Sequence, residues 1–202
     1  MAEITEPLAE IKLYTDFKSP YAFLAFDPVM ALPEKYKVRI LWRPFQLRIK
    51  GKGQRSVYSE YKVKYSYMDA RRWANLRGGL MLRGPLKIFD TTPALIGSLF
   101  AERKGKLVEY GRIVYEAFFK RELAVDEVDA VAGVLKQIGL DEAEFRTFLE
   151  HEGPAQYEAI QEESAADEIF GVPIMRFNGE NFWGYDRIGL LEMRLKDKGL
   201  ER

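Results

Sequence analysis

The chain has 202 residues, of which 47% are hydrophobic and 13% aromatic, enough for one large domain with a buried core. Its 31 basic and 31 acidic side chains balance, so the overall charge favours neither nucleic acid nor an anionic membrane as a partner. The sequence has no cysteine, which excludes disulfides, thiolate-bound metals and dithiol redox chemistry. The single histidine, His151, is expected to face solvent, and no metal site is predicted.

Two features of the sequence bear on its location. The first ten residues contain three glutamates and lack the apolar core of a signal peptide. No stretch reaches the roughly 18 apolar residues that a membrane helix needs. We therefore expect a cytoplasmic protein without a membrane partner.

The first predicted elements are a strand over residues 11–15 and a helix that begins at Ser19. Serine is a preferred N-cap, and Pro20 is favoured at the first helical position because its missing N–H would be unpaired there anyway. The positive end of the helix dipole also suits an anion. We expect the helix to kink or restart at Asp27-Pro28 and to stop by Leu32-Pro33.

The middle of the chain is predicted to be helical. A second strand over residues 38–42 should pair in parallel with the first through a right-handed βαβ unit. Residues 57–77 form an aromatic and basic segment with a helical stripe that we interpret as core, made of Tyr65, Met68, Arg72, Trp73 and Leu76. Further helices are predicted over residues 94–103, 107–120, 125–139, 141–151 and 153–169, and no strand is expected between residues 56 and 167.

A hairpin is predicted near the end of the chain. Strands over residues 174–177 and 181–183 flank Asn178-Gly179, whose residue types suit the two positive-φ positions of a type I′ turn. Because a proline at the head of a strand cannot donate a ladder hydrogen bond, we predict a cis Val172-Pro173 peptide. A last helix should follow over residues 187–198.

These motifs together resemble one family. They are Asp16-Phe17-Lys18-Ser19-Pro20-Tyr21, Trp42-Arg43-Pro44-Phe45, Gly171-Val172-Pro173 and Phe182-Trp183-Gly184-Tyr185-Asp186-Arg187. In order and spacing they resemble the 2-hydroxychromene-2-carboxylate isomerase family and the related kappa-class glutathione transferase, both similar in fold to DsbA-type oxidoreductases. The resemblance implies an α/β, thioredoxin-like fold with a large all-helical insertion. Its thioredoxin-like part would comprise residues 11–55 and 168–202, and its insertion residues 56–167.

The resemblance also implies glutathione as cofactor, with Ser19 as the catalytic residue. A serine hydroxyl at a helix N-terminus can donate a hydrogen bond to a thiolate, which the helix dipole also favours. A serine that attacked carbon would need a neighbouring base, and none is implied beside Ser19. The backbone at Pro173 and Ile174 would pair with the extended cofactor as a strand does.

Four further residues match cofactor contacts of the family. Tyr185 and Asp186 correspond to the contact with the γ-glutamyl end, although Asp186 could equally be the N-cap of the last helix. Lys62 corresponds to a lysine near the cofactor's carboxylate end. Gln54 stands where the family often has asparagine, and Gln46-Leu47-Arg48-Ile49 replaces the usual stretch beside the substrate pocket.

Three functions compete at this stage. The first is a glutathione-dependent isomerase, which would act on a small aromatic carboxylate by reversible addition of the thiolate. The second is a kappa-like transferase, which would release a stable glutathione conjugate. The third is a non-catalytic thioredoxin-like binding module, because this fold is often reused. The resemblance further implies a homodimer.

Overall fold

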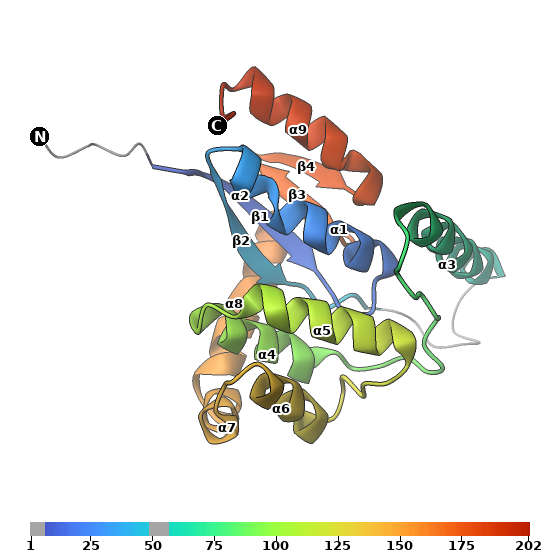
Figure 1. Ribbon diagram of the computed structural model, residues 1–202, viewed down its shortest axis with the longest axis vertical. Helices are drawn as coiled ribbons and strands as arrows, with labels where there is room; N and C mark the ends of the chain where they lie inside the picture. Colours follow the sequence, from blue (N-terminus) through green and yellow to red (C-terminus); the bar gives the residue numbers. More distant parts are fainter. Residues whose placement is uncertain (1–6, 49–56) are drawn as a thin grey trace, which may run out of the picture.

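The computed structural model describes residues 7–48 and 57–202 and is built on a four-stranded sheet in the order β2-β1-β3-β4 (Figure 1). Strand β1 (Ala9–Thr15) pairs in parallel with β2 (Val38–Pro44) and antiparallel with β3 (Ile174–Phe177). Strand β4 (Glu180–Trp183) pairs antiparallel with β3 and forms an edge of the sheet. The predicted parallel pair and the thioredoxin-like α/β class are confirmed.

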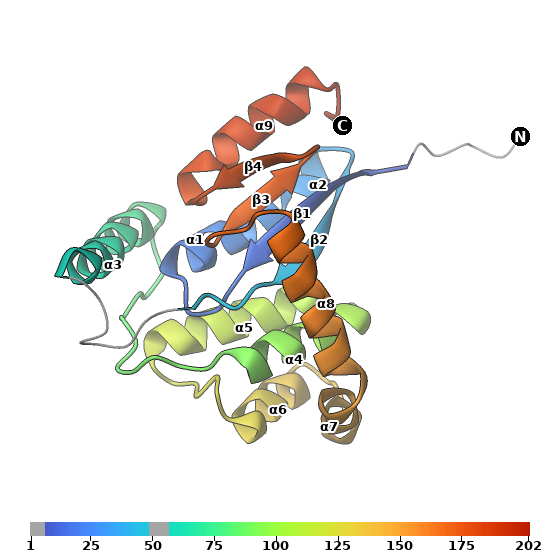
Figure 2. The same cartoon turned by 180° about the vertical axis from the view of Figure 1, so that it is seen from behind.

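Helices cover both faces of this sheet. Helix α1 (Pro20–Met30) and helix α9 (Ile188–Asp197) lie on one face, and α8 (Glu152–Ala166) crosses the other (Figures 1 and 2). The turn between β3 and β4 has φ of 49° at Asn178 and 81° at Gly179, which confirms the predicted hairpin. A short 3₁₀ turn, η1 (Tyr185–Arg187), precedes α9.

Five more helices of the described chain lie between β2 and β3 in the sequence, before α8. They are α3 (Val57–Arg77), α4 (Thr92–Arg103), α5 (Leu107–Lys120), α6 (Val128–Gln137) and α7 (Glu142–Glu150). Residues 57–167 contain no strand, as predicted. None of the helices in the described ranges combines the length and apolar character that a membrane crossing requires.

The predicted restart of the helix at Asp27-Pro28 is wrong. Helix α1 runs through Pro28 to Met30, and the restart comes later, in the short α2 (Leu32–Lys35). Proline removes the N–H that would bond the carbonyl four residues earlier, which is that of Leu24. That carbonyl instead accepts a hydrogen bond from the guanidinium of Arg77 at the end of α3, so it stays paired.

The interpretation of the α3 stripe as core holds only for Trp73, which is partly buried against the core, and is wrong for the other members. Tyr65 is 53% exposed, Met68 43% and Leu76 77%. The residues that α3 buries completely or nearly so are Ala70 and Ala74, small side chains that allow a close approach. The helix therefore contacts the rest of the fold along a narrow line and turns most of the stripe outward.

An aromatic core fixes the beginning of α1. The ring of Phe17 lies 4.8 Å from that of Tyr115, and the ring of Phe26 lies 5.7 Å from that of Trp42. The Trp42 indole donates to Ser98 Oγ at 2.8 Å, so this buried donor is paired. Burial of these large rings fixes the turn between β1 and α1 against α5.

A polar network fixes the opposite face of the sheet. Lys12 Nζ and Tyr14 Oη each donate to the carboxylate of Asp167, just beyond α8, at 2.6 Å. Burial alone would raise the pKa of Asp167, but these hydrogen bonds outweigh it and hold the pKa below its ordinary value. Tyr14 also packs against Val172 and Ile174. The network therefore supports the chain just before β3.

Candidate active site

Ser19 lies where the first helix meets the segment before β3. It is 3% exposed, and its Oγ accepts a hydrogen bond from the Ala22 N–H at 3.2 Å, which confirms the predicted N-cap. The same hydroxyl donates to the carbonyl of Val172 at 3.2 Å. One side chain thus caps α1 and joins it to a segment 153 residues later in the chain.

The Val172-Pro173 peptide is cis, as predicted. The Pro173 carbonyl accepts a hydrogen bond from the Gly184 N–H at 3.0 Å, whereas the Val172 N–H has no acceptor within residues 7–48 and 57–202. Ile174 is fully buried, in register with Tyr14 on β1 and Trp183 on β4. Among the described residues, the N–H of Val172, two residues before Ile174, is therefore a backbone donor left for a ligand.

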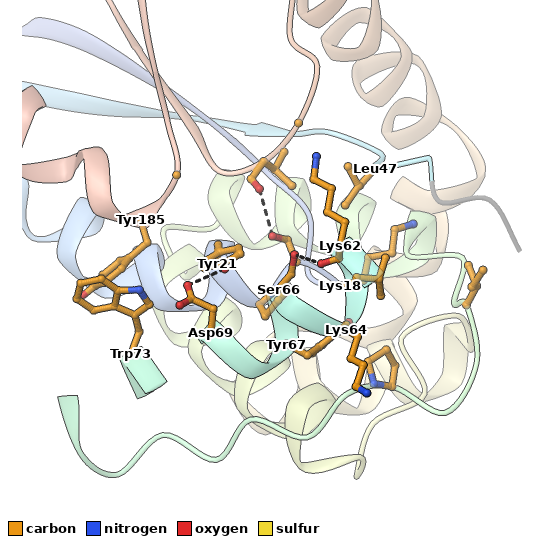
Figure 3. Close-up of a pocket in the computed structure, with 18 of the residues that line it drawn as sticks. Lys18, Tyr21, Leu47, Lys62, Lys64, Ser66, Tyr67, Asp69, Trp73 and Tyr185 are labelled. Atoms are coloured by element: carbon orange, nitrogen blue, oxygen red, sulfur yellow. Dashed lines mark hydrogen bonds between the residues drawn. The ribbon is translucent and has the colours of Figure 1, made fainter. Parts of the chain in front are cut away.

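A cavity of about 1050 Å³ opens beside Ser19 (Figure 3). Helix α3, the start of α1, residues 85–89, residues 170–172 and the turn from Trp183 to Arg187 line it. Of the predicted site residues, Ser19, Lys62, Tyr185 and Asp186 lie on its wall. Pro173 and Ile174 adjoin the lining residue Val172 without lining the cavity, and Gln54 lies outside the described residues.

One end of the cavity is aromatic and acidic. The rings of Trp73 and Tyr185 meet edge to face at 5.4 Å, and Figure 3 shows them together, away from Lys18 and Leu47. Asp186 is exposed and accepts a hydrogen bond from Arg187 Nη1 at 2.6 Å. Its side chain caps neither η1 nor α9, so the alternative interpretation of Asp186 as an N-cap is wrong.

Lys62 is an exposed cation that lines the cavity. Its Nζ lies 6.0 Å from the centre of the Trp183 ring, and the ring of Phe170 lies 4.9 Å from that of Trp183. Trp183 and Phe170 are 47% and 66% exposed. Exposed aromatic side chains beside a cation form a surface that suits a ligand with a carboxylate.

Two lining residues near the start of α1, Lys18 and Tyr21, were not predicted as site residues. Tyr21 donates to Asp69 Oδ2 at 2.8 Å, and burial together with this bond raises the pKa of the Tyr21 phenol. Lys18 is only 6% exposed, and its counter-ion Asp16 is completely buried. Burial raises the pKa of Asp16, and the charge of Lys18 opposes that rise. A lysine directly before the capping serine was the signal available in the sequence.

The fold and the site together define a class. The protein is a thioredoxin-fold protein that carries a serine, and no cysteine anywhere in its sequence, at the N-terminus of the first helix. It belongs to the family described as the DSBA-like thioredoxin domain, which its residues 10–196 match.

Individual proteins similar to this chain include several that are named 2-hydroxychromene-2-carboxylate isomerase. The chain is 28% identical to 2-hydroxychromene-2-carboxylate isomerase of Pseudomonas putida, over 90% of this chain and 92% of that protein. It is 25% identical to the protein of the same name from Sphingobium xenophagum, over 93% and 98%. A solved structure of 2-hydroxychromene-2-carboxylate isomerase superposes with a TM-score of 0.78 at 24% identity, over 93% of this chain and 95% of that one.

More distant structures share the fold alone. The cytosolic disulfide reductase DsbM of Pseudomonas aeruginosa, solved with GSH, superposes with a TM-score of 0.63 at 14% identity. The superposition covers 93% of this chain and 99% of that one. The DsbA-like architecture predicted from the sequence is thereby confirmed.

Proposed function

We propose that this protein is a glutathione-dependent isomerase of 2-hydroxychromene-2-carboxylate or a similar intermediate of aromatic catabolism. One observation carries the proposal: the Ser19 hydroxyl lies at the helix N-terminus, beside a cis-proline segment and a cavity of about 1050 Å³, in a chain without cysteine. The names of the Pseudomonas and Sphingobium relatives support the same reaction. We also propose a cytoplasmic homodimer.

The residues around Ser19 fit a peptide thiol. Val172 offers a backbone N–H without an acceptor in the described chain, as an extended peptide would need for strand-like pairing. Lys62 offers a cation to a carboxylate, and Asp186 an exposed anion to an ammonium group. When bound, glutathione would supply a thiol that adds reversibly to a conjugated double bond and so permits rotation about it.

The role of Ser19 is to stabilise the sulfur anion. Its bond to the Val172 carbonyl is long, at 3.2 Å, so the hydroxyl proton can turn to a stronger acceptor in the cavity. Both partners of its oxygen, the Ala22 N–H and the Val172 carbonyl, are backbone groups, and neither can act as a base. The exposed His151 lies at the junction of α7 and α8. Ser19 is therefore suited to donate a hydrogen bond and unsuited to attack carbon.

Product analysis tests the proposal. The protein is mixed with 2-hydroxychromene-2-carboxylate, with and without glutathione, and products are separated by liquid chromatography. We expect a cis–trans isomerised product only when glutathione is present, with glutathione recovered unchanged. A stable glutathione adduct would indicate a transferase. No turnover and no glutathione binding would indicate a binding module.

A further inference from the structure

The buried ammonium of Lys18 has spare hydrogen-bonding capacity at the cavity. Its Nζ lies 3.4 Å from Asp16 Oδ2 and 3.4 Å from the carbonyl of Phe89, and both distances are long for charged hydrogen bonds. An ammonium has three donors, and the described residues provide no third acceptor. Since Lys18 is 6% exposed, bulk water does little to satisfy that donor.

Asp16 has closer partners than Lys18 Nζ. Its carboxylate accepts from the Leu47 N–H at 2.7 Å and from Thr91 Oγ1 at 2.8 Å, and it also accepts from the Lys18 N–H at 3.2 Å. These groups hold the carboxylate where it approaches the Lys18 ammonium only to 3.4 Å. The positive charge of Lys18 is therefore incompletely neutralised, and an anionic group of a ligand in the cavity can complete the neutralisation.

An apolar wall adjoins this ammonium. Leu86 is 80% exposed and Ile88 44% exposed, although both line the cavity. The segment that bears them is tied down: the Arg83 N–H bonds the Phe119 carbonyl at 2.9 Å and Arg121 Nε bonds the Gly84 carbonyl at 2.8 Å. Exposed apolar side chains on an anchored segment are typical of a ligand surface.

We propose that Lys18 and the wall of Leu86 and Ile88 form a subsite for the aromatic carboxylate substrate. This subsite is separate from the end of the cavity that contains Tyr185 and Asp186. Lys18 binds the carboxylate, and the wall covers the apolar ring. The Phe89 carbonyl that contacts Lys18 joins the two parts, and Figure 3 shows Lys18 far from Tyr185 across the cavity. This inference rests on the proposed function and assigns residues to its substrate.

The test measures binding of 2-naphthoate and of its neutral analogue 2-naphthamide by calorimetry, without glutathione. In the wild type we expect the carboxylate to bind more tightly than the amide. Lys18→Met should weaken naphthoate binding about ten- to hundredfold, the range of a hydrogen bond to a charged group, and leave naphthamide binding unchanged. The control Lys64→Met removes an exposed lining cation instead and should change naphthoate binding by less than about threefold.

A second variant covers the case in which Lys18→Met does not fold. Leu86→Ser alters an exposed side chain and should weaken both ligands by about five- to tenfold. The inference is overturned if the two ligands bind alike, if folded Lys18→Met binds naphthoate as the wild type does, or if Leu86→Ser has no effect. Glutathione binding is titrated separately: if glutathione binds but naphthoate does not, only this inference fails, and if glutathione does not bind, the proposed function fails.

Discussion

Replacing Ser19 with alanine tests the double role of its hydroxyl in the unliganded protein. The substitution removes the cap of α1, which costs about 1 kcal/mol, and leaves the buried Val172 carbonyl without its donor, which costs about 1 kcal/mol more. We therefore expect a loss of about 2 kcal/mol in the free energy of unfolding. For a chain of this length that corresponds to a fall of roughly 4–8 °C in melting temperature.

Asp141→Ala is a matched control for this experiment. Asp141 caps α7 by accepting from the Glu144 N–H at 2.8 Å, and the structure records no second hydrogen bond of its side chain within the described residues. Its replacement should cost only the cap, about 1 kcal/mol. Urea unfolding followed by circular dichroism measures both losses. Equal losses in the two variants, or a loss below about 0.5 kcal/mol for Ser19→Ala, would refute the contribution of the bond to Val172.

Three further predictions concern the thiol, the acid stability and the packing of α1. The pKa of the bound glutathione thiol, followed by thiolate absorbance, should lie below that of free glutathione and recover partly in Ser19→Ala; free-like titration in both proteins would refute the role of Ser19. The pKa of Asp167 is lowered in the folded state, so its stabilising contribution is present above the ordinary value of 3.8 and is lost as the pH falls; urea unfolding should show Asp167→Asn costing more at pH 7 than at pH 3. Gly111→Ala should cost about 1 to 3 kcal/mol, because a new Cβ would collide with the buried Phe26 ring, whereas Gly133→Ala, in open space on α6, should stabilise by up to about 1 kcal/mol.

Features set by neighbouring residues could be predicted from the sequence. The Ser19 cap, the Asn178-Gly179 turn and the cis Val172-Pro173 bond each depend on residue types that favour one local geometry. The family resemblance, by contrast, was the source of the prediction that four residues share one site, and all four line the cavity: Ser19, Lys62, Tyr185 and Asp186. Local patterns alone would not have brought together segments from three parts of the chain.

Features that depend on distant partners could not be predicted. Pro28 is tolerated inside α1 because Arg77, some fifty positions later, supplies the missing donor to Leu24. Most of the α3 stripe was misassigned because helical spacing identifies a face without showing whether anything covers it. The importance of Lys18 depends on the distances to Asp16 and Phe89, which only the folded chain reveals.

The placement of the tryptophans allows their intrinsic fluorescence to report on binding in the cavity. Of the three in the sequence, Trp42 is fully buried in the core, whereas Trp73 and Trp183 line the cavity. A bound molecule would shield the two cavity indoles from a dissolved quencher such as iodide and leave the emission of Trp42 unchanged. Because Trp73 adjoins Tyr185 while Trp183 adjoins Lys62, single Trp→Phe variants would report separately on the two neighbourhoods, without any label attached to the chain.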